Sequence, residues 1–194
     1  MRKLTYFVAS TIDGYIAGPD GSDPSGPDGI FPVEGDHIDA IFSEYPEIAP
    51  GPVRKALGIE PENSRFDTAL EGRRSYEIGL KAGITNAYPH LRHYVFSRSM
   101  ARSPDPDVEI VSTDPIAKVR ELKQEDGKGI WLCGGAQLAD ALSAEIDELI
   151  VKLNPVVIGS GIPLFAGDFA IRRYELAGRH IYASGVAFLT YVPR

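Results

Sequence analysis

Apolar residues along this chain recur with two different periods. Short runs of β-branched and aromatic residues bounded by Gly, Pro or Asp are typical of strands, and apolar residues three or four positions apart are typical of helices. The predicted strands lie at 4–10, 67–70, 93–99, 108–112, 129–135 and 147–159, with two more between 171 and 192. The predicted helices lie within 35–45, 73–83, 113–127 and 136–144.

The chain therefore alternates strands and helices up to about residue 150 and then continues with strands alone. Such alternation favours a largely parallel sheet covered by helices, because parallel strands need a crossover connection. The consecutive strands at the end favour an antiparallel hairpin at one edge of that sheet. Since there is no internal repeat and no low-complexity linker, residues 1–194 are expected to form a single α/β domain.

Two aspartates mark predicted helix starts. Asp36 and Asp114 precede helical patterns and are expected N-caps, because an aspartate oxygen can accept hydrogen bonds from the unpaired N–H groups of the first turn. Pro115 fits the first helical position after Asp114. By contrast, the segment 19–35 is dense in Pro, Gly and Asp and is expected to hold no regular element. Eight of the fifteen prolines fall between 19 and 65, so that whole region is expected to be rich in loops.

The composition excludes several classes of protein. With 43% hydrophobic and 24% charged residues the chain is typical of a soluble globular protein, and no apolar stretch approaches the roughly 20 residues of a membrane helix. The one cysteine, Cys133, excludes an internal disulfide, so a cytoplasmic location is expected. The formal charge of −7 argues against nucleic-acid binding, which needs a basic surface. Any anionic ligand must therefore meet local basic groups.

The stretch IWLCGGAQLADAL, residues 130–142, places two glycines where an apolar strand ends and a helix begins. A helix N-terminus carries unpaired N–H groups and a partial positive charge, and Gly134 and Gly135 have no side chains to keep a phosphate away. The same pair is also compatible with a tight turn that binds nothing. The chain has neither a Walker loop nor a Rossmann G-x-G-x-x-G sequence, so a nucleotide here would need another scaffold.

Two other strand ends combine bare backbone or hydroxyl groups with arginine, whose planar guanidinium suits phosphate oxygens. EGRRSYE places Gly72 and Arg73 at a second strand-to-helix junction. FSRS places Ser97, Arg98 and Ser99 at the end of the next strand. In a parallel sheet these ends and the glycine pair would share the carboxyl edge, where α/β sheets bind ligands. Together they favour an anion site over an empty turn.

Other polar residues fit ordinary structural roles. Arg74 and Arg102 are expected on the solvated surface. His90 and His93 are three positions apart, but no third or fourth ligand is in sight, so no metal site is expected.

Five segments in this order, ASTIDGYIAG, EGRRSYE, YVFSRS, WLCGGAQLADAL and DELIVKLNPVVIGSGIPLF, resemble the dihydrofolate reductase-like superfamily. More narrowly, the chain is similar to the branch that includes the C-terminal reductase domain of the bifunctional riboflavin biosynthesis protein. The resemblance covers nearly the whole chain. It implies an α/β three-layer fold, in which helices flank a central mixed eight-stranded sheet that ends in an antiparallel C-terminal hairpin.

The resemblance also implies that NADPH binds in extended form across the strand ends. The backbone of Ala9 would meet the nicotinamide carboxamide. The residues on the pyrophosphate and 2′-phosphate side and at the adenosine ribose phosphate would be Gly72, Arg73, Ser75, Ser97, Arg98 and Ser99. The residues that hold the pyrophosphate and the nicotinamide ribose would be Gly134, Gly135, Ala136, Gln137 and Leu138.

Two aspartates are candidate catalytic residues. Asp13 in TIDGYIAG would lie beside the nicotinamide, although an Asp-Gly turn whose carboxylate bonds its own backbone explains it equally well. Folate-reducing members carry an acidic residue on the first helix that hydrogen-bonds the pterin, and Asp39 is the candidate here. Asp39 also lies in the first helical turn, where an acid simply favours the helix dipole.

The expected function is that of an NADPH-dependent reductase that transfers a hydride to a small heterocyclic substrate, pteridine-like or pyrimidine-like. Proton delivery could use Asp13, Asp39 or an ordered water, and the substrate itself stays open. The alternative is a nucleotide-binding module of the same fold without turnover. The last hairpin is rich in Tyr, Phe and Val and, together with the resemblance, favours a homodimer.

Overall fold

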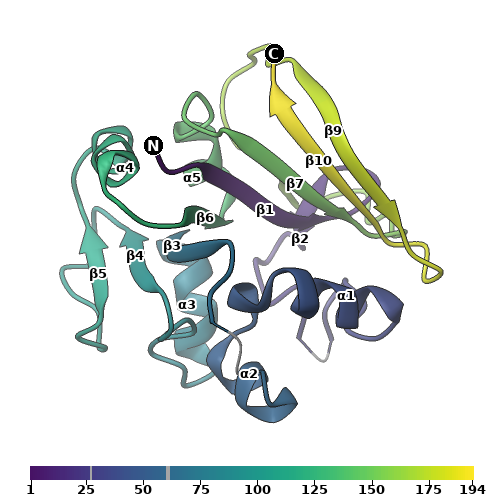
Figure 1. The fold of residues 1–194 in the computed structure, drawn as a ribbon, viewed down its shortest axis with the longest axis horizontal. Coiled ribbons are helices and arrows are strands. Elements are labelled where there is room, and N and C mark those ends of the chain that lie inside the picture. Colours follow the sequence, from purple (N-terminus) through teal and green to yellow (C-terminus); the bar gives the residue numbers. More distant parts are fainter. Residues whose placement is uncertain (27, 60–61) are drawn as a thin grey trace.

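The computed structural model describes residues 1–26, 28–59 and 62–194. Its centre is a sheet of eight strands in the order β5-β4-β3-β6-β1-β7-β10-β9, and β2 pairs with β8 separately (Figure 1). The strands are β1 (Leu4–Ser10), β2 (Tyr15–Ala17), β3 (Phe66–Gly72), β4 (Arg92–Phe96), β5 (Val108–Val111), β6 (Gly129–Gly134), β7 (Glu148–Leu153), β8 (Ile162–Pro163), β9 (Tyr174–Ile181) and β10 (Ala187–Pro193). The helices are α1 (Asp36–Glu44), α2 (Gly51–Leu57), α3 (Arg73–Lys81), α4 (Pro115–Gln124) and α5 (Ala136–Ala141), with a 3-10 turn at Pro46–Ile48.

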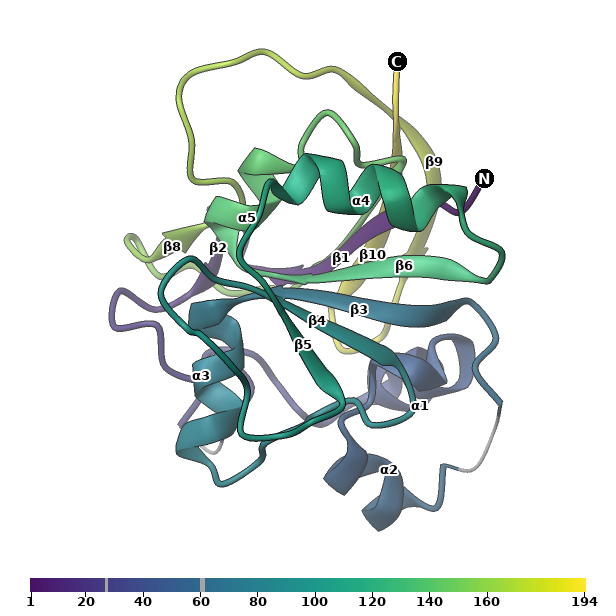
Figure 2. The same ribbon diagram turned by 90° about the vertical axis from the view of Figure 1, so that its left-hand side faces the viewer.

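The strands from β5 to β7 in that order all run parallel to their neighbours. Strand β10 is antiparallel to both β7 and β9. Helices α4 and α5 lie on one side of the sheet, and α1, α2 and α3 lie on the other (Figure 2). The predicted three-layer fold, with a mixed eight-stranded sheet and an antiparallel C-terminal hairpin, is confirmed.

Alternate residues of β1 supply both layers of the core. Leu4, Tyr6 and Val8 belong to the apolar cluster under α4 and α5. Phe7 points the other way, into an aromatic cluster that includes Ile41 of α1. Because a central parallel strand is buried on both faces, its sequence is a nearly continuous apolar run and not an alternating one. We call the side of the sheet that carries α1 the α1 face.

One predicted helix cap is confirmed and the other is wrong. Asp114 accepts a hydrogen bond from the backbone N–H of Ile116 at 2.9 Å and precedes α4. Asp36 is the first residue of α1 and not its cap. Its carboxylate instead accepts hydrogen bonds from the N–H groups of Ala183 at 2.7 Å and Ser184 at 3.1 Å. A tertiary contact with the β9–β10 turn has therefore replaced the local cap.

The loop-rich region holds elements that its pattern does not predict. Helix α2 buries none of its residues, so it has no apolar period that could reveal it. Strand β2 is only three residues long and depends on β8, far along the chain, for its pairing. Pro27 and Pro61, two of the prolines in this region, lie outside the described residues.

None of the helices in the described parts of the chain is long and apolar enough to cross a membrane.

Candidate functional site

Two of the three predicted strand ends lie on either side of the third. Because β3 pairs in parallel with both β4 and β6, its last residue, Gly72, is in register with Phe96, and Glu71 is in register with Gly134. The Ser97–Ser99 turn follows β4 directly, and the glycine pair follows β6. The fold thus brings the three stretches to one edge of the sheet, as the sequence pattern predicted (Figure 2).

The glycines at this edge leave bare backbone on both sides of a narrow space. A Cβ atom added to Gly72 would lie 3.6 Å from the backbone nitrogen of Gly135 and 3.8 Å from the carbonyl oxygen of Gly134. A Cβ atom on Gly135 would lie 3.3 Å from the hydroxyl of Ser75, tighter than an ordinary contact. Gly134 has a φ of 154°, which side chains rarely adopt, and the Gly134–Gly135 peptide bond is cis. Gly72, Ser75 and the glycine pair therefore form one cradle.

The two helices that start here have no side-chain caps. Gly72 is the N-cap of α3 and Gly135 is the N-cap of α5, and neither has a side chain that could bond the first N–H groups. Uncapped N–H groups at a helix start are available to an anion. Arg73, at the start of α3, is paired with Glu77 one turn later at 3.2 Å, and both side chains are partly exposed.

The Ser97–Ser99 turn combines a buried hydroxyl with a free cation. Ser97 is buried, and its hydroxyl oxygen accepts hydrogen bonds from the N–H groups of Ser99 at 3.3 Å and Met100 at 2.9 Å. Arg98 is exposed and makes no hydrogen bond or ion pair with any described residue. The serine fixes the turn, and the arginine is left free to meet a ligand.

The remaining residues after the glycine pair contribute mainly backbone. Ala136 and Leu138 are buried, and Leu138 packs into the core under α4 and α5. Gln137 between them is exposed. Of the three side chains, only that of Gln137 can reach a ligand from the start of α5.

Strands β1 and β6 stop pairing before either of them ends. Their last paired residues are Tyr6 and Leu132, yet β1 continues to Ser10 beside β7, and β6 continues to Gly134 beside β3. Beyond this point β1 pairs only with β7, and β6 pairs only with β3. Between the ends of the two strands there is therefore a gap without β pairing, with Ala9 of β1 on one side and Gly134 of β6 on the other. We call this gap the β1–β6 split. It leaves the backbone at the end of β1 without a strand partner on that side.

Asp13 lies in the turn between β1 and β2. Its carboxylate accepts hydrogen bonds from the N–H groups of Gly159 at 2.7 Å and Ile158 at 3.2 Å, so it joins the β1–β2 turn to the loop after β7. The hydroxyl of Thr11 lowers the pKa of Asp13, and the two backbone donors lower it further. The carboxylate is exposed, and it bonds both its own turn, through Thr11 and its own backbone N–H, and the distant loop.

Asp39 does not share the buried side of α1. The helix buries His37 and Ile41, whereas Asp39 is exposed and makes no hydrogen bond or ion pair with a described residue. His37 is fully buried, and its Nδ1 atom lies 3.0 Å from the hydroxyl of Ser184. The imidazole, not the carboxylate, is therefore the polar group that α1 turns toward the sheet.

Sequence reasoning missed Lys152. This residue lies on β7 and is only 8% exposed, and its ammonium group makes no hydrogen bond or ion pair with a described residue. Burial lowers the pKa of Lys152 to about 8. The sequence did contain a sign of this buried lysine, because Lys152 interrupts the apolar run LIVKL of a predicted strand.

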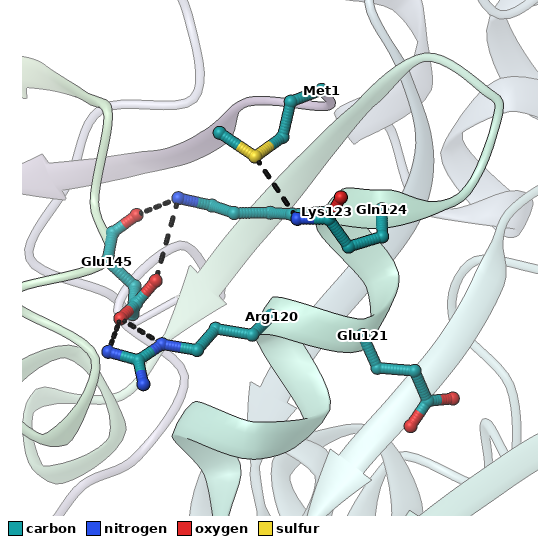
Figure 3. A pocket seen from close by; sticks show the side chains of 6 residues that line it. All are labelled: Met1, Arg120, Glu121, Lys123, Gln124 and Glu145. Atoms are coloured by element: carbon teal, nitrogen blue, oxygen red, sulfur yellow. Dashed lines mark hydrogen bonds and ion pairs between the residues drawn. The ribbon is translucent and has the colours of Figure 1, made fainter.

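A surface cavity of about 550 Å³ lies elsewhere, near the N-terminus and the end of α4 (Figure 3). Its charged side chains are already paired: the guanidinium of Arg120 contacts the Glu145 carboxylate at 2.7 Å, and Lys123 donates to the Glu145 carbonyl at 2.6 Å. Because helices that follow parallel strands run back to the amino edge, this cavity lies at the opposite edge from the glycine cradle. Its position and its internal pairing give it no part in the site described above.

Within the described ranges, no three His, Cys, Asp or Glu side chains come together as a metal site. His93, one of the two histidines considered for that purpose, contacts the carboxylate of Glu71 at 2.7 Å and the side-chain oxygen of Asn86 at 3.0 Å. Its ring is used inside the core.

Comparison with known proteins supplies the family. The RibD C-terminal domain family matches residues 74–188. The chain belongs to this family. The match begins one residue after Arg73, so it includes Ser75, the Ser97–Ser99 turn and the glycine pair but not Ala9.

Curated relatives match most of the chain. The uncharacterized protein YwjB of Bacillus subtilis is 33% identical over 166 residues, which are 84% of this chain and 83% of that protein. The uncharacterized protein YyaP of the same organism is 25% identical over 203 residues, covering 98% of this chain and 94% of that protein.

Solved structures share the fold. A protein of Shewanella sp. PV-4 assigned to riboflavin biosynthesis superposes with a TM-score of 0.74 at 20% identity, covering 100% of this chain and 99% of the other. Dihydrofolate reductase from Enterococcus faecalis, solved with NADP(H) and RAB-propyl, gives a TM-score of 0.65 at 13% identity, covering 99% of this chain and 96% of the other. The bifunctional deaminase/reductase of Thermotoga maritima gives 0.64 at 13% identity, where the chain spans 57% of that protein. The fold is dihydrofolate reductase-like.

Proposed function

We propose that this protein is an NADPH-dependent reductase that transfers a hydride to a small heterocyclic substrate, pteridine-like or pyrimidine-like. The observation that carries the proposal is the β1–β6 split beside the cradle of Gly72, Ser75 and the glycine pair. A flat ring can enter where two strands part, and phosphates can approach where side chains are missing. Membership of a reductase-related family supports the same conclusion.

The residues present fit a dinucleotide. The cradle has uncapped helix N–H groups on two sides and a hydroxyl between them, which suits a pyrophosphate. Arg98 is a free, exposed guanidinium one strand away, and it would meet the 2′-phosphate that distinguishes NADPH from NADH. Ala9, on the β1 side of the split, would form backbone hydrogen bonds with the nicotinamide carboxamide.

The cofactor, when bound, supplies the hydride, so the chain has to position the rings and exclude water. The substrate would lie on the α1 face, between the end of β1 and α1. The aromatic cluster of this face, which includes Phe7, Trp131 and Tyr182, provides an apolar floor close to that position. An apolar floor favours a flat, uncharged ring system.

The first experiment measures nucleotide binding by the change in nicotinamide fluorescence when NADPH or NADH is added to the protein. We expect NADPH to bind more tightly. The Arg98→Ala variant should weaken NADPH at least tenfold more than NADH, because only NADPH carries the 2′-phosphate. Arg102→Ala, a nearby exposed arginine, is the matched control and should change neither affinity.

Equal losses for both nucleotides in the Arg98 variant would remove the 2′-phosphate assignment. Failure of both nucleotides to bind would overturn the proposed function. Binding without NADPH oxidation across dihydropterin, pyrimidine and quinone compounds would leave the protein as a nucleotide-binding module without turnover.

We extend the proposal to a cytoplasmic homodimer that acts on small molecules and not on nucleic acid. Strand β9 is an edge of the sheet and exposes Leu176 and Ile181, and the segment before it exposes Phe169 and Ile171. Exposed apolar side chains on an open edge favour association. Analytical ultracentrifugation should show a dimer that dissociates in the Phe169→Asp, Ile181→Asp double variant; a monomeric wild-type protein would contradict this part of the proposal.

A further inference from the structure

Lys152 lies beside the place where the two reacting rings would meet. It is in register with Ala9 of β1 on one side and with Phe188 of β10 on the other. Side chains alternate between the two faces of a strand, and Ile150, two positions earlier, packs in the aromatic cluster of the α1 face. Lys152 therefore extends from the same face, next to the residue that would hold the nicotinamide carboxamide.

No counter-ion accompanies this cation. Lys152 is 8% exposed, and no carboxylate lies within ion-pair distance of it in the described parts of the chain. A largely buried lysine side chain without a counter-ion is costly, and proteins keep such side chains mainly where they function. The contrast is Lys123, which is 5% exposed but contacts the carboxylate of Asp147 at 2.7 Å.

The titratable groups on the elements packed around Lys152 do not neutralise it. Its strand neighbours Ala9 and Phe188 are uncharged. On α1, Asp36 and Asp39 are exposed, Glu44 is paired with Arg65, and the pKa of His37 is lowered by burial and by the charge of Lys152. On β9 and the turn that follows it, the titratable side chains on this face are His180 and Tyr182.

Burial and the positive charge of Lys152 lower the pKa of His37, so its imidazole stays neutral at pH 7 and does not act as a counter-ion. Its Nε2 atom is buried without a hydrogen-bond partner among the described residues. Two polar groups without partners, one on β7 and one on α1, face the same region. Each therefore has hydrogen-bonding capacity that no described residue uses.

The two aspartates predicted as catalytic residues are less suited to deliver a proton. The pKa of Asp13 is lowered by its hydrogen bonds, so this carboxyl group holds no proton near neutral pH. Asp39 points into solvent from the exposed side of α1. A general acid works best when its pKa is near the working pH, and burial brings the pKa of Lys152 to about 8.

We propose that Lys152 is the proton donor of the reductase, acting on a substrate whose reduced bond is a C=N or C=O bond within a flat ring. The proposal rests on the proposed function, because it places Lys152 beside the nicotinamide. His37 would hydrogen-bond the same ring and orient it.

Lys152 takes part in one balanced step. As a hydride from the reduced nicotinamide adds to the carbon of the C=N or C=O bond, the π electron pair of that bond moves to the nitrogen or oxygen. Lys152 Nζ gives its proton to this atom. A C–H bond and an N–H or O–H bond form, the substrate is reduced by two electrons, and the nicotinamide is oxidised. Lys152 is left neutral and regains a proton from solvent.

The first test titrates the Lys152 side chain by NMR in protein with isotope-labelled lysines, with Lys152→Met used to assign the signal. We expect a pKa near 8 in the free protein. Saturating NADP⁺ should lower the pKa by about one pH unit relative to saturating NADPH, because only the oxidised ring is positively charged. The signal of Lys123 is the control and should respond to neither nucleotide.

The second test follows oxidation of bound NADPH in single-turnover experiments, with 7,8-dihydropterin as the C=N probe and isatin as the C=O probe. Lys152→Met should slow the oxidation on the order of a hundredfold and leave the Kd for NADPH unchanged. The wild-type rate should fall as pH rises through 8. Lys152→Arg keeps the charge, but the pKa of a guanidinium is too high for it to give up a proton near neutral pH, so this variant should be slow at every pH.

Each failure has its own signature. If neither nucleotide binds, the proposed function itself fails. If the nucleotides bind but the pKa of Lys152 is the same with NADP⁺ and NADPH, the placement of Lys152 is overturned, whether or not a probe is reduced. A Lys152→Met variant that reduces either probe at the wild-type rate overturns its role as proton donor. Because Lys152→Met removes an unpaired charge, we expect it to fold, and Lys152→Arg provides a second variant.

Discussion

At the amino edge of the parallel strands the buried cations have partners, whereas at the carboxyl edge two cations have none. Arg2, at the start of β1, pairs with Asp67, and Lys123 pairs with Asp147. At the other edge, Arg98 and Lys152 make no hydrogen bond or ion pair with any described residue. Among the buried lysines and arginines of the described residues, Arg2 and Lys123 at the amino edge therefore have carboxylate partners, and Lys152 at the carboxyl edge has none.

The difference separates stability from function within one fold. A paired buried charge holds the structure together, because removing one partner leaves the other uncompensated. An unpaired one costs stability and is retained where a ligand can supply the missing partner. The protein has a formal charge of −7, so an anionic ligand at the carboxyl edge depends on local cations such as Arg98.

The largest expected effect is at the amino edge. Lys123→Met should lower the free energy of unfolding by about 3 kcal/mol, because it leaves the carbonyl of Glu145 without its donor and the partly exposed carboxylate of Asp147 without its cation. Lys152→Met is the matched variant at the other edge and should not lower stability. Urea denaturation at pH 7 measures both. Similar losses of stability in the two variants would contradict the distinction between a paired and an unpaired buried lysine.

The second prediction concerns pH. The pKa of Lys152 is about 8 in the folded protein and 10.5 in an unfolded chain, so the unfolded state binds more protons between these values. Stability contributed by this residue must therefore rise with pH across this window, by at most about 3 kcal/mol. We expect the free energy of unfolding of the wild type, minus that of Lys152→Met, to increase from pH 8 to pH 10.5. Taking the difference removes the opposing contributions of buried tyrosines and Cys133. A flat difference would contradict the prediction.

The smallest effect probes the bare backbone of the carboxyl edge. Gly72→Ala places its Cβ at an ordinary contact distance of 3.6 Å from the Gly135 nitrogen and should be tolerated. Gly72→Val adds two methyl groups in the cradle and should weaken NADPH about tenfold, or about 1.4 kcal/mol, with little change in unfolding temperature. Fluorescence titration and thermal unfolding measure the two quantities. A valine variant that binds as the wild type does would show that the ligand does not use this cradle.

The elements that the sequence predicted correctly are those whose signals are local. Helix α4 has an aspartate cap, a proline at its first position and an apolar side, and all three act within a few residues. The parallel strands are buried on both faces and therefore read as apolar runs. The glycine pair could be placed at a strand-to-helix junction for the same reason, since both flanking elements have strong patterns.

The features that the sequence did not reveal depend on partners far along the chain. The carboxylate of Asp36 caps no helix because the N–H groups of Ala183 and Ser184 compete for it. Strand β2 exists because β8 pairs with it. Helix α2 has no buried side, so burial imposes no apolar period on its sequence.

By itself, the sequence determined the class of the fold, the order of its elements and the three anion-favouring strand ends, because hydrophobic period, caps and glycine junctions are local properties. Only the tertiary structure decided which of these ends lie together and which polar groups remain without partners. In the folded chain, β1 and β6 no longer pair after Tyr6, and Lys152 is buried beside Ala9. On α1, His37 faces the interior and Asp39 faces solvent. Whether a charge is paired depends on residues hundreds of atoms away along the chain, so no local pattern can show it.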